Sequence, residues 1–118
     1  MKEYKQIHFD SGKLNKRITL ISYSEIENEI GQLIQKPVPI KTVWAFLEPI
    51  RGHQQTEAQR LSNETTYKIL TRYHKGITQE MLINYEDKKL YIHQVIDIEE
   101  RHAYMEIIAT WKGEMWSE

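Results

Sequence analysis

The residues of this sequence whose types and spacing could support chemistry are three carboxylates and five histidines. Glu25, Glu27 and Glu29 alternate, so an extended backbone would present them on one face, where paired carboxylates can act as general acid and base. They lack an apolar setting that would separate their pKa values, which makes a solvated segment the better interpretation. No two histidines lie three or four residues apart on an expected helix, as a zinc-binding helix requires. The histidines are His8, His53, His74, His93 and His102.

Other catalytic and cofactor-binding patterns are missing from the sequence. The five glycines, at positions 12, 31, 52, 76 and 113, never cluster into a phosphate-binding loop, and no serine lies in a nucleophile elbow. The chain has no cysteine, which excludes disulfides and thiolate metal sites. We therefore expect no enzyme activity, no metal ion and no cofactor.

Length and composition indicate one soluble globular domain over residues 1–118, with 1–11 and 114–118 as flexible ends. The hydrophobic fraction of 40% and the charged fraction of 28% are ordinary for such a domain. The formal net charge of -1 argues against a protein whose main task is to neutralise nucleic-acid phosphates. The longest apolar run, Val43 to Leu47, is too short to span a bilayer, and we expect no membrane partner.

The elements that must position these residues are mostly strands, because apolar residues alternate along six segments of the chain. Such short strands with few helical segments predict a mainly β fold, a small antiparallel β-barrel or sandwich. The polar EDKK segment predicts a hairpin turn between the fourth and fifth strands. The predicted strands are Arg17–Tyr23, Thr42–Glu48, Thr65–Tyr73, Met81–Tyr85, Leu90–Asp97 and Ala103–Trp111.

Two segments interrupt the strand pattern. Residues His53 to Leu61 predict one short α-helix, with Ala58 and Leu61 toward the sheet and polar residues toward solvent. Residues Ser24 to Ile40 predict a long irregular loop after the first strand, because Gly31 and the Pro37 and Pro39 pair oppose regular structure.

A nucleic-acid interface is an alternative interpretation of the third predicted strand. Lys68 and Arg72 lie beside Tyr67 and Tyr73 there, and small barrels can stack bases on aromatic rings to bind RNA or single-stranded DNA. The slightly acidic charge balance and the lack of an RNA-binding signature favour an ordinary strand with one core face and one charged face.

Seven pieces of the sequence occur in an order and at spacings that match one protein family. They are GKLNKRITL, ENEIG, VWAFLEPIRG, EAQRL, ETTYKILTRYHKGIT, MLINYEDKKLYIHQVID and YMEIIATWKG. Their order resembles the head-tail adaptor family of long-tailed bacteriophages and prophages, also called head-tail joining, head-closure or stopper proteins, and the resemblance covers about residues 12 to 113. The chain departs from the family pattern at Val38-Pro39-Ile40, where an aromatic residue is common, and at Leu82, where arginine is common.

This resemblance implies a structural virion protein of the head-tail connector. Similar proteins form rings, commonly dodecameric, below the portal and adaptor, where they complete and close the DNA-filled head and dock the tail. The isolated subunit can be a monomer, and DNA passes without sequence-specific binding. The expected locations are the virion and, during assembly, the bacterial host cytoplasm. A tail-completion ring protein of related fold and a small RNA- or single-stranded-DNA-binding barrel are the alternatives.

Two sets of residues follow as site hypotheses. The loop from Ser24 to Ile40 is expected to project toward the channel and give it an acidic lining. Residues of the predicted helix and of the basic turn after the third strand are expected to contact adjacent subunits or the ring above. The channel residues are Glu25, Glu27, Glu29 and Gly31, and the contact residues are Gln55, Gln59, Arg60, Arg72, His74 and Lys75.

Overall fold

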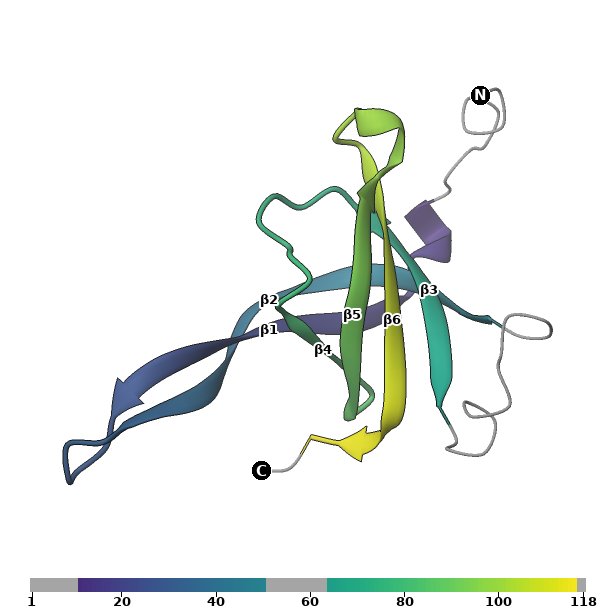
Figure 1. The fold of residues 1–118 in the computed structure, drawn as a ribbon. Helices are drawn as coiled ribbons and strands as arrows, with labels where there is room; N and C mark the ends of the chain where they lie inside the picture. Colours follow the sequence, from purple (N-terminus) through teal and green to yellow (C-terminus); the bar gives the residue numbers. More distant parts are fainter. Residues whose placement is uncertain (1–10, 51–63, 117–118) are drawn as a thin grey trace.

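Six antiparallel strands close into one irregular barrel. A computed structural model of the chain describes residues 11–50 and 64–116, and strands dominate them (Figure 1). The sheet order is β1-β2-β3-β6-β5-β4, and β4 pairs back with β1 to close the ring. The mainly β fold is thereby confirmed. The elements are η1 (Ser11–Lys13), β1 (Lys16–Glu27), β2 (Leu33–Ile50), β3 (Thr65–Arg72), β4 (Leu82–Tyr85), β5 (Lys88–Asp97), η3 (Ile98–Glu100) and β6 (Tyr104–Met115).

The core lies inside this barrel and is built from alternate residues of every strand. Successive side chains of a strand point to opposite faces, so a period of two in the sequence gives one buried and one outward face. On β3, Tyr67, Ile69 and Thr71 are buried while Lys68 and Arg72 are exposed, as the alternation predicts. β2 contributes the buried residues Val43 and Ala45. The largest fully buried side chains come from the other five strands and are Ile18, Leu20, Ile69, Ile83, Leu90, Ile107 and Thr71.

The predicted EDKK hairpin is confirmed as a two-residue turn. Glu86 and Asp87 both have positive φ, 52° and 68°, which is the pattern of a type I′ turn whose twist suits a β-hairpin. The Asn84 side-chain oxygen accepts a hydrogen bond of 2.9 Å from the Asp87 N–H. Tyr85 and Lys88 are the pair that closes the turn.

The C-terminal end is more regular than the sequence predicts. Residues 114–118 were expected to be flexible, but β6 continues to Met115, and two hydrogen bonds fix Trp116. The Trp116 backbone N–H donates to the Asp87 carbonyl at 2.8 Å, and its indole N–H donates to the Ile83 carbonyl at 3.2 Å. The amphipathic indole therefore caps the β4–β5 turn, which corrects the expectation for residues 114–116.

The long irregular loop expected from Ser24 to Ile40 is wrong, because the structure forms a β-hairpin there. β1 and β2 remain paired from Ile21 opposite Pro39 to Glu27 opposite Leu33, and only residues 28–32 form the turn. Pro37 and Pro39 are tolerated because β2 pairs with β3 only from Ala45 onward, so its other edge is free at the prolines. Because Pro37 and Pro39 are two residues apart, their backbone nitrogens, which carry no hydrogen, face the same edge of the strand.

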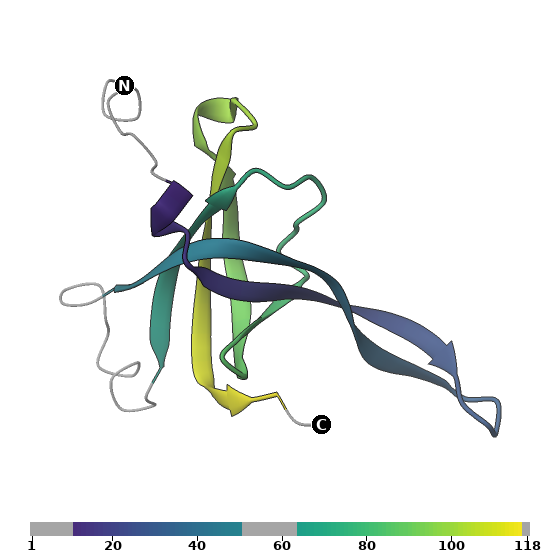
Figure 2. The same ribbon diagram turned by 180° about the vertical axis from the view of Figure 1, so that it is seen from behind.

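A β-bulge marks the point where this hairpin leaves the barrel. Leu20 pairs with Lys41 and Ile21 with Pro39, so Ile40 is an extra residue on β2. Bulges bend the strand and increase its twist. β4 pairs with β1 only at Thr19, Leu20 and Ile21. Beyond that point, among the described strands, β1 and β2 pair only with each other. We call residues 22–40 the arm; Figures 1 and 2 show it projecting from the barrel on the side away from η1.

The predicted helix from His53 to Leu61 lies outside the described residues, as do Gln55, Gln59 and Arg60. Within residues 11–50 and 64–116, no helix is long and apolar enough to cross a membrane.

Candidate assembly interface

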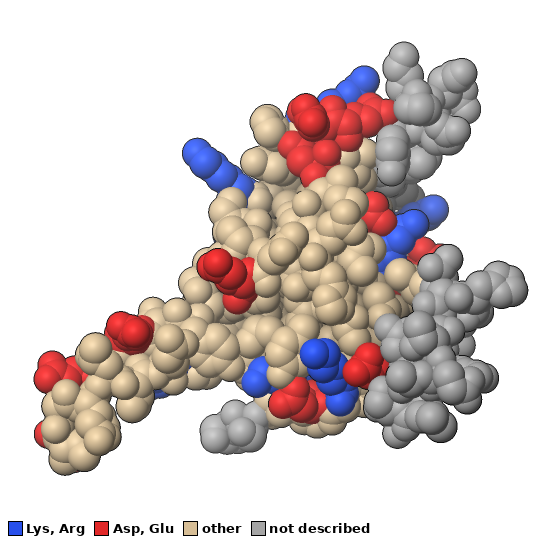
Figure 3. Space-filling model, in the orientation of Figure 1, with Lys and Arg blue, Asp and Glu red and all other residues tan. Residues whose placement is uncertain are grey.

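The arm exposes a series of large apolar side chains to solvent. Ile30 is 77% exposed and Leu33 is 67% exposed, and both lie at the tip. The space-filling view shows a mostly uncharged arm with a few carboxylates near its end (Figure 3). Contiguous exposed apolar surface of this kind marks an interaction site in a folded protein. The exposed apolar residues of the arm include Tyr23, Ile26, Ile30, Leu33, Ile34 and Ile40.

The exposed apolar residues are divided between the two faces of the arm. Directly paired residues of antiparallel strands share a face, so the Ile26–Ile34 pair forms an apolar surface. Glu25 and Glu27 lie on the opposite face, together with Leu33, which pairs with Glu27. The alternation of the glutamates predicts the shared face of Glu25 and Glu27, whereas Glu29 lies in the turn.

The tip of the arm is held by one asparagine. The Asn28 side-chain oxygen accepts hydrogen bonds from the N–H groups of Ile30, at 3.1 Å, and Gln32, at 2.8 Å. The Asn28 N–H donates to the Gln32 carbonyl at 2.8 Å. Gly31 completes the turn with φ of +84°, a conformation that side chains with a Cβ rarely adopt. The channel residue predicted at position 31 is thus a turn glycine.

A second exposed apolar surface lies on the outer wall of the barrel. In β2 the buried Val43 and Ala45 alternate with Trp44 and Phe46, whose side chains face outward and are 53% and 37% exposed. The Arg17 guanidinium lies 5.0 Å from the centre of the Trp44 ring, and Leu70 of β3 pairs with Phe46. Tryptophan, phenylalanine and arginine are the residues enriched at protein interfaces. We call Arg17, Trp44, Phe46 and Leu70 the wall patch.

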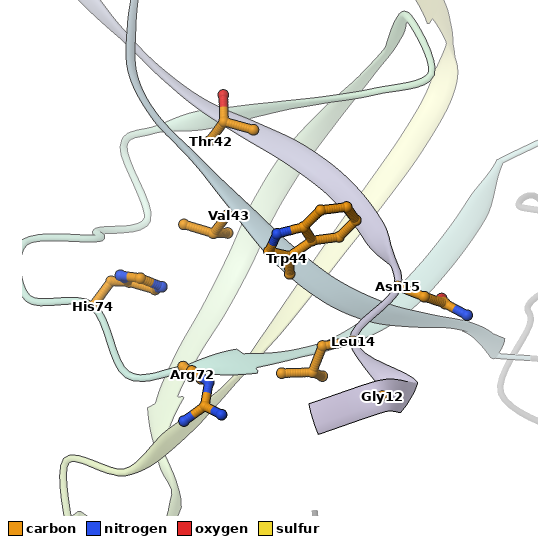
Figure 4. A pocket seen from close by; sticks show the side chains of 8 residues that line it. All are labelled: Gly12, Leu14, Asn15, Thr42, Val43, Trp44, Arg72 and His74. Carbon is orange, nitrogen blue, oxygen red and sulfur yellow. The ribbon is translucent and has the colours of Figure 1, made fainter. Parts of the chain in front are cut away.

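An open groove of about 520 Å³ adjoins the wall patch (Figure 4). Leu14, Val43 and Trp44 make it largely apolar, and Arg72 and His74 line it as well. A smaller hollow of about 440 Å³ lies nearby and shares Gly12 and Asn15 with it. Among the residues that the structure describes, no carboxylate lines either of them. The groove is lined by Gly12, Leu14, Asn15, Thr42, Val43, Trp44, Arg72 and His74.

The predicted contact residues Arg72 and His74 are therefore brought together, at the same groove. The Arg72 guanidinium is exposed and lies 5.9 Å from the centre of the Tyr104 ring. His74 is half-buried, and its backbone N–H donates to the Met105 sulfur at 3.3 Å. Burial, and secondly the positive charge of Lys41, lower the pKa of His74 below its usual value.

Lys75 is exposed in the turn beyond His74 and does not line the groove. Leu14, Asn15 and Arg17 come from the start of the described chain, and no motif in the sequence marks them as surface residues of a site. The alternation in TVWAFLE does predict an exposed aromatic surface, because it places Trp44 and Phe46 on the face opposite Val43, Ala45 and Leu47.

The third strand is a poor platform for stacking bases. Tyr67 lies inside the barrel, 9% exposed, and its ring packs edge-on against Tyr85 with ring centres 5.9 Å apart. Tyr73 contacts the His102 ring at 4.7 Å. Lys68 faces outward and lies 3.7 Å from a Glu106 carboxylate oxygen, which offsets its charge. In the part of the chain that the structure describes, no group of three or more potential metal ligands was found.

Two solved structures share this fold. The solution structure of protein SF1141 from Shigella flexneri 2a is 19% identical, with a TM-score of 0.65 over 90% of this chain and 99% of that one. A chain from the virion of a native gene transfer agent particle is 13% identical, with a TM-score of 0.62 over 83% of this chain and 94% of that one. No curated protein sequence gives a significant match. The model of the phage head completion protein family matches residues 9–112, nearly the whole sequence, and the chain therefore belongs to that family of structural virion proteins.

Proposed function

We propose that this protein forms a ring in the head-tail connector, below the portal and adaptor, where it completes and closes the DNA-filled head and docks the tail. Family membership supports a structural role in the phage head. One chain of similar fold comes from a particle described as the virion of a gene transfer agent. The observation that carries the proposal is the arm, a two-stranded ribbon that exposes aliphatic side chains. Within residues 11–50 and 64–116, neither edge of the arm has a partner strand beyond Ile21.

Two different exposed surfaces supply what a head-to-tail ring requires. The arm tip and the wall patch differ in shape and charge, so a contact between them would join unlike faces of neighbouring subunits. Contacts of this heterologous kind close into rings when the rotation between subunits permits. A dodecamer is the ring size proposed, with portal and adaptor proteins above and tail proteins below, assembled in the bacterial host cytoplasm.

The acidic face of the arm suits a channel that passes DNA. Glu25, Glu27 and Glu29 are proposed to project toward the channel, with Gly31 allowing the sharp turn at the tip. Negative side chains repel DNA phosphates, which allows DNA to slide without sequence-specific binding. Arg72, His74 and Lys75, together with Gln55, Gln59 and Arg60 outside the described residues, are proposed to contact neighbouring subunits or the ring above.

The test is to mix the purified protein with the portal–adaptor complex of the same phage and to image the product by electron microscopy. An added ring of density below the adaptor is the expected result. Binding to isolated tails instead would identify a tail-completion ring. Failure to bind under conditions where tails still attach to heads would contradict the proposal.

A further inference from the structure

We infer that the arm tip of each subunit docks into the groove beside Trp44 of the next copy of this chain. The inference rests on the proposed ring and specifies which surfaces join its subunits. The occupant of the groove is the apolar tip around Ile30, and the receiving surface is the floor made by Leu14, Val43 and Trp44.

The two surfaces lie at opposite ends of the same hairpin. Arg17 pairs with Trp44 near the start of β1, and Ile26 pairs with Ile34 near its end. Nine residues of extended chain separate Arg17 from Ile26, a span of about 30 Å at 3.3 Å per residue. Figures 1 and 2 agree that the arm points away from η1, which adjoins the groove. A subunit therefore cannot place its arm in its own groove, and the contact must be made between copies.

The apolar surfaces complement each other. Ile30 is the most exposed large apolar residue of the described chain and stands on a turn that Asn28 fixes. The hydrogen bonds to Asn28 fix the turn that carries Ile30, so the turn itself loses little conformational freedom when it binds. The groove offers an exposed indole beside Leu14, and Arg17 already stacks on that indole. Tryptophan and arginine are the residues most often found at interface hot spots, and Trp44 and Arg17 would supply them here.

The charges at the tip and the groove are also complementary. Glu29 lies in the turn at the tip, next to Ile30, whereas Glu25 and Glu27 lie on the face opposite Ile26 and Ile34. Among the described residues, the groove is lined by Arg72 and by no carboxylate, and Lys41 is close enough to lower the pKa of His74. The Glu29 carboxylate and a basic groove attract over roughly 8 Å at physiological salt, and two tips or two grooves repel. This pattern favours arm-to-groove contact over arm-to-arm contact.

The free β2 edge of the arm favours contact through side chains at the tip. Pro37 and Pro39 block backbone pairing along the edge of β2, since they have no N–H to donate. Docking through Ile26, Ile30 and Ile34 leaves Glu25 and Glu27 on the opposite face, still available to line the proposed channel.

Cysteine cross-linking tests this contact cleanly because the chain has no cysteine of its own. The double variant Ile30→Cys/Asn15→Cys places one thiol on the arm tip and one at the groove. A disulfide needs Cα atoms within about 7 Å, so the two thiols of one subunit cannot join. The control is Ile30→Cys/Lys112→Cys, in which Lys112 is exposed on β6 eight residues beyond Tyr104. Each variant is bound to the portal–adaptor complex and then oxidised.

We expect a ladder of covalent oligomers from the arm–groove variant in the assembled ring and monomer from the control. A visible ring in which the arm–groove variant stays monomeric, or in which both variants cross-link equally, would overturn the inference and leave the proposed function intact. No ring with unmodified protein would overturn both. As a second measurement, Trp44→Ala should reduce ring incorporation at least ten-fold while the far-ultraviolet circular dichroism spectrum stays unchanged. Incorporation of this variant at the wild-type level would also overturn the inference.

Discussion

Substitutions at the exposed tip of the arm should weaken assembly and leave the folding of the subunit unchanged. In the double variant Ile30→Ser/Leu33→Ser, two apolar side chains that are 77% and 67% exposed become polar. Because neither side chain is buried in the folded subunit, the free energy of unfolding should change by less than about 0.5 kcal/mol. Urea denaturation of the isolated protein measures this part of the prediction.

The expected effect on assembly is much larger. Full burial of an isoleucine or leucine side chain contributes about 1.5–3 kcal/mol, so the exposed part of each can contribute about 1–2 kcal/mol when a neighbour covers it. Loss of both would weaken each subunit contact by roughly 2–4 kcal/mol, which corresponds to about 30- to 1,000-fold in affinity. Incorporation into the connector, measured by electron microscopy or by sedimentation of the bound ring, should fall accordingly.

A matched control is Met115→Ser, which removes an apolar side chain of comparable exposure, 52%, from the end of β6 instead of from the arm. It should leave both stability and incorporation close to those of the wild type. Wild-type incorporation of the arm variant would refute the reasoning, because the arm would then not be an assembly surface. Equal losses in both variants would refute it as well, since apolar exposure alone would then explain the effect.

Three further predictions concern the barrel, the arm tip and the groove. Ile69→Ala, at a fully buried site, should lower the free energy of unfolding by about 2–5 kcal/mol in urea denaturation, and a loss under 1 kcal/mol would argue against the barrel core. Gly31→Ala, at φ of +84°, should cost about 1–2 kcal/mol locally and accelerate hydrogen exchange of the Gln32 amide about 5- to 30-fold; Gly113→Ala, at φ of +92° in β6, is the control that should leave this amide unchanged. Since the pKa of His74 is lowered on folding, the unfolded chain binds the proton more tightly than the folded chain does. The contribution of His74 to the free energy of unfolding is therefore fully present above pH 6.5, the ordinary pKa, and is lost as the pH falls from there toward the folded pKa. His74→Gln should flatten that part of the pH profile of unfolding, and an unchanged profile would contradict the assignment.

The barrel could be predicted from the sequence because its strands bury one face and expose the other. In β3, alternation of Tyr67, Ile69 and Thr71 with charged residues fixes the register, since a slip by one residue would put Lys68 into the core. The turn at Glu86 and Asp87 could also be predicted, because a short polar segment between two strands of alternating apolar residues usually forms a tight hairpin turn.

The arm could not be predicted in the same way because no core face orders it. Pro37 and Pro39 indicate irregular structure when each residue is considered alone. They are compatible with a strand only because β3 ends its pairing at Ala45 and leaves the edge of β2 free, which is a property of the whole sheet. The groove could not be predicted for a related reason: Leu14 and Asn15 lie near His74 and Arg72 only because β2 pairs with β1 on one edge and with β3 on the other.

The unequal lengths of the strands explain why the arm exists and why it favours an intermolecular role. β2 has 18 residues and β1 has 12, whereas β4, which closes the barrel against β1, has 4. Once β4 ends its pairing at Ile21, the hairpin continues alone, and an isolated two-stranded ribbon is only marginally stable in water. The Asn28 turn stabilises its tip, but leaves Ile30 and Leu33 exposed. Covering these side chains with another subunit would stabilise both the ribbon and the contact, so assembly and ordering of the arm should be coupled.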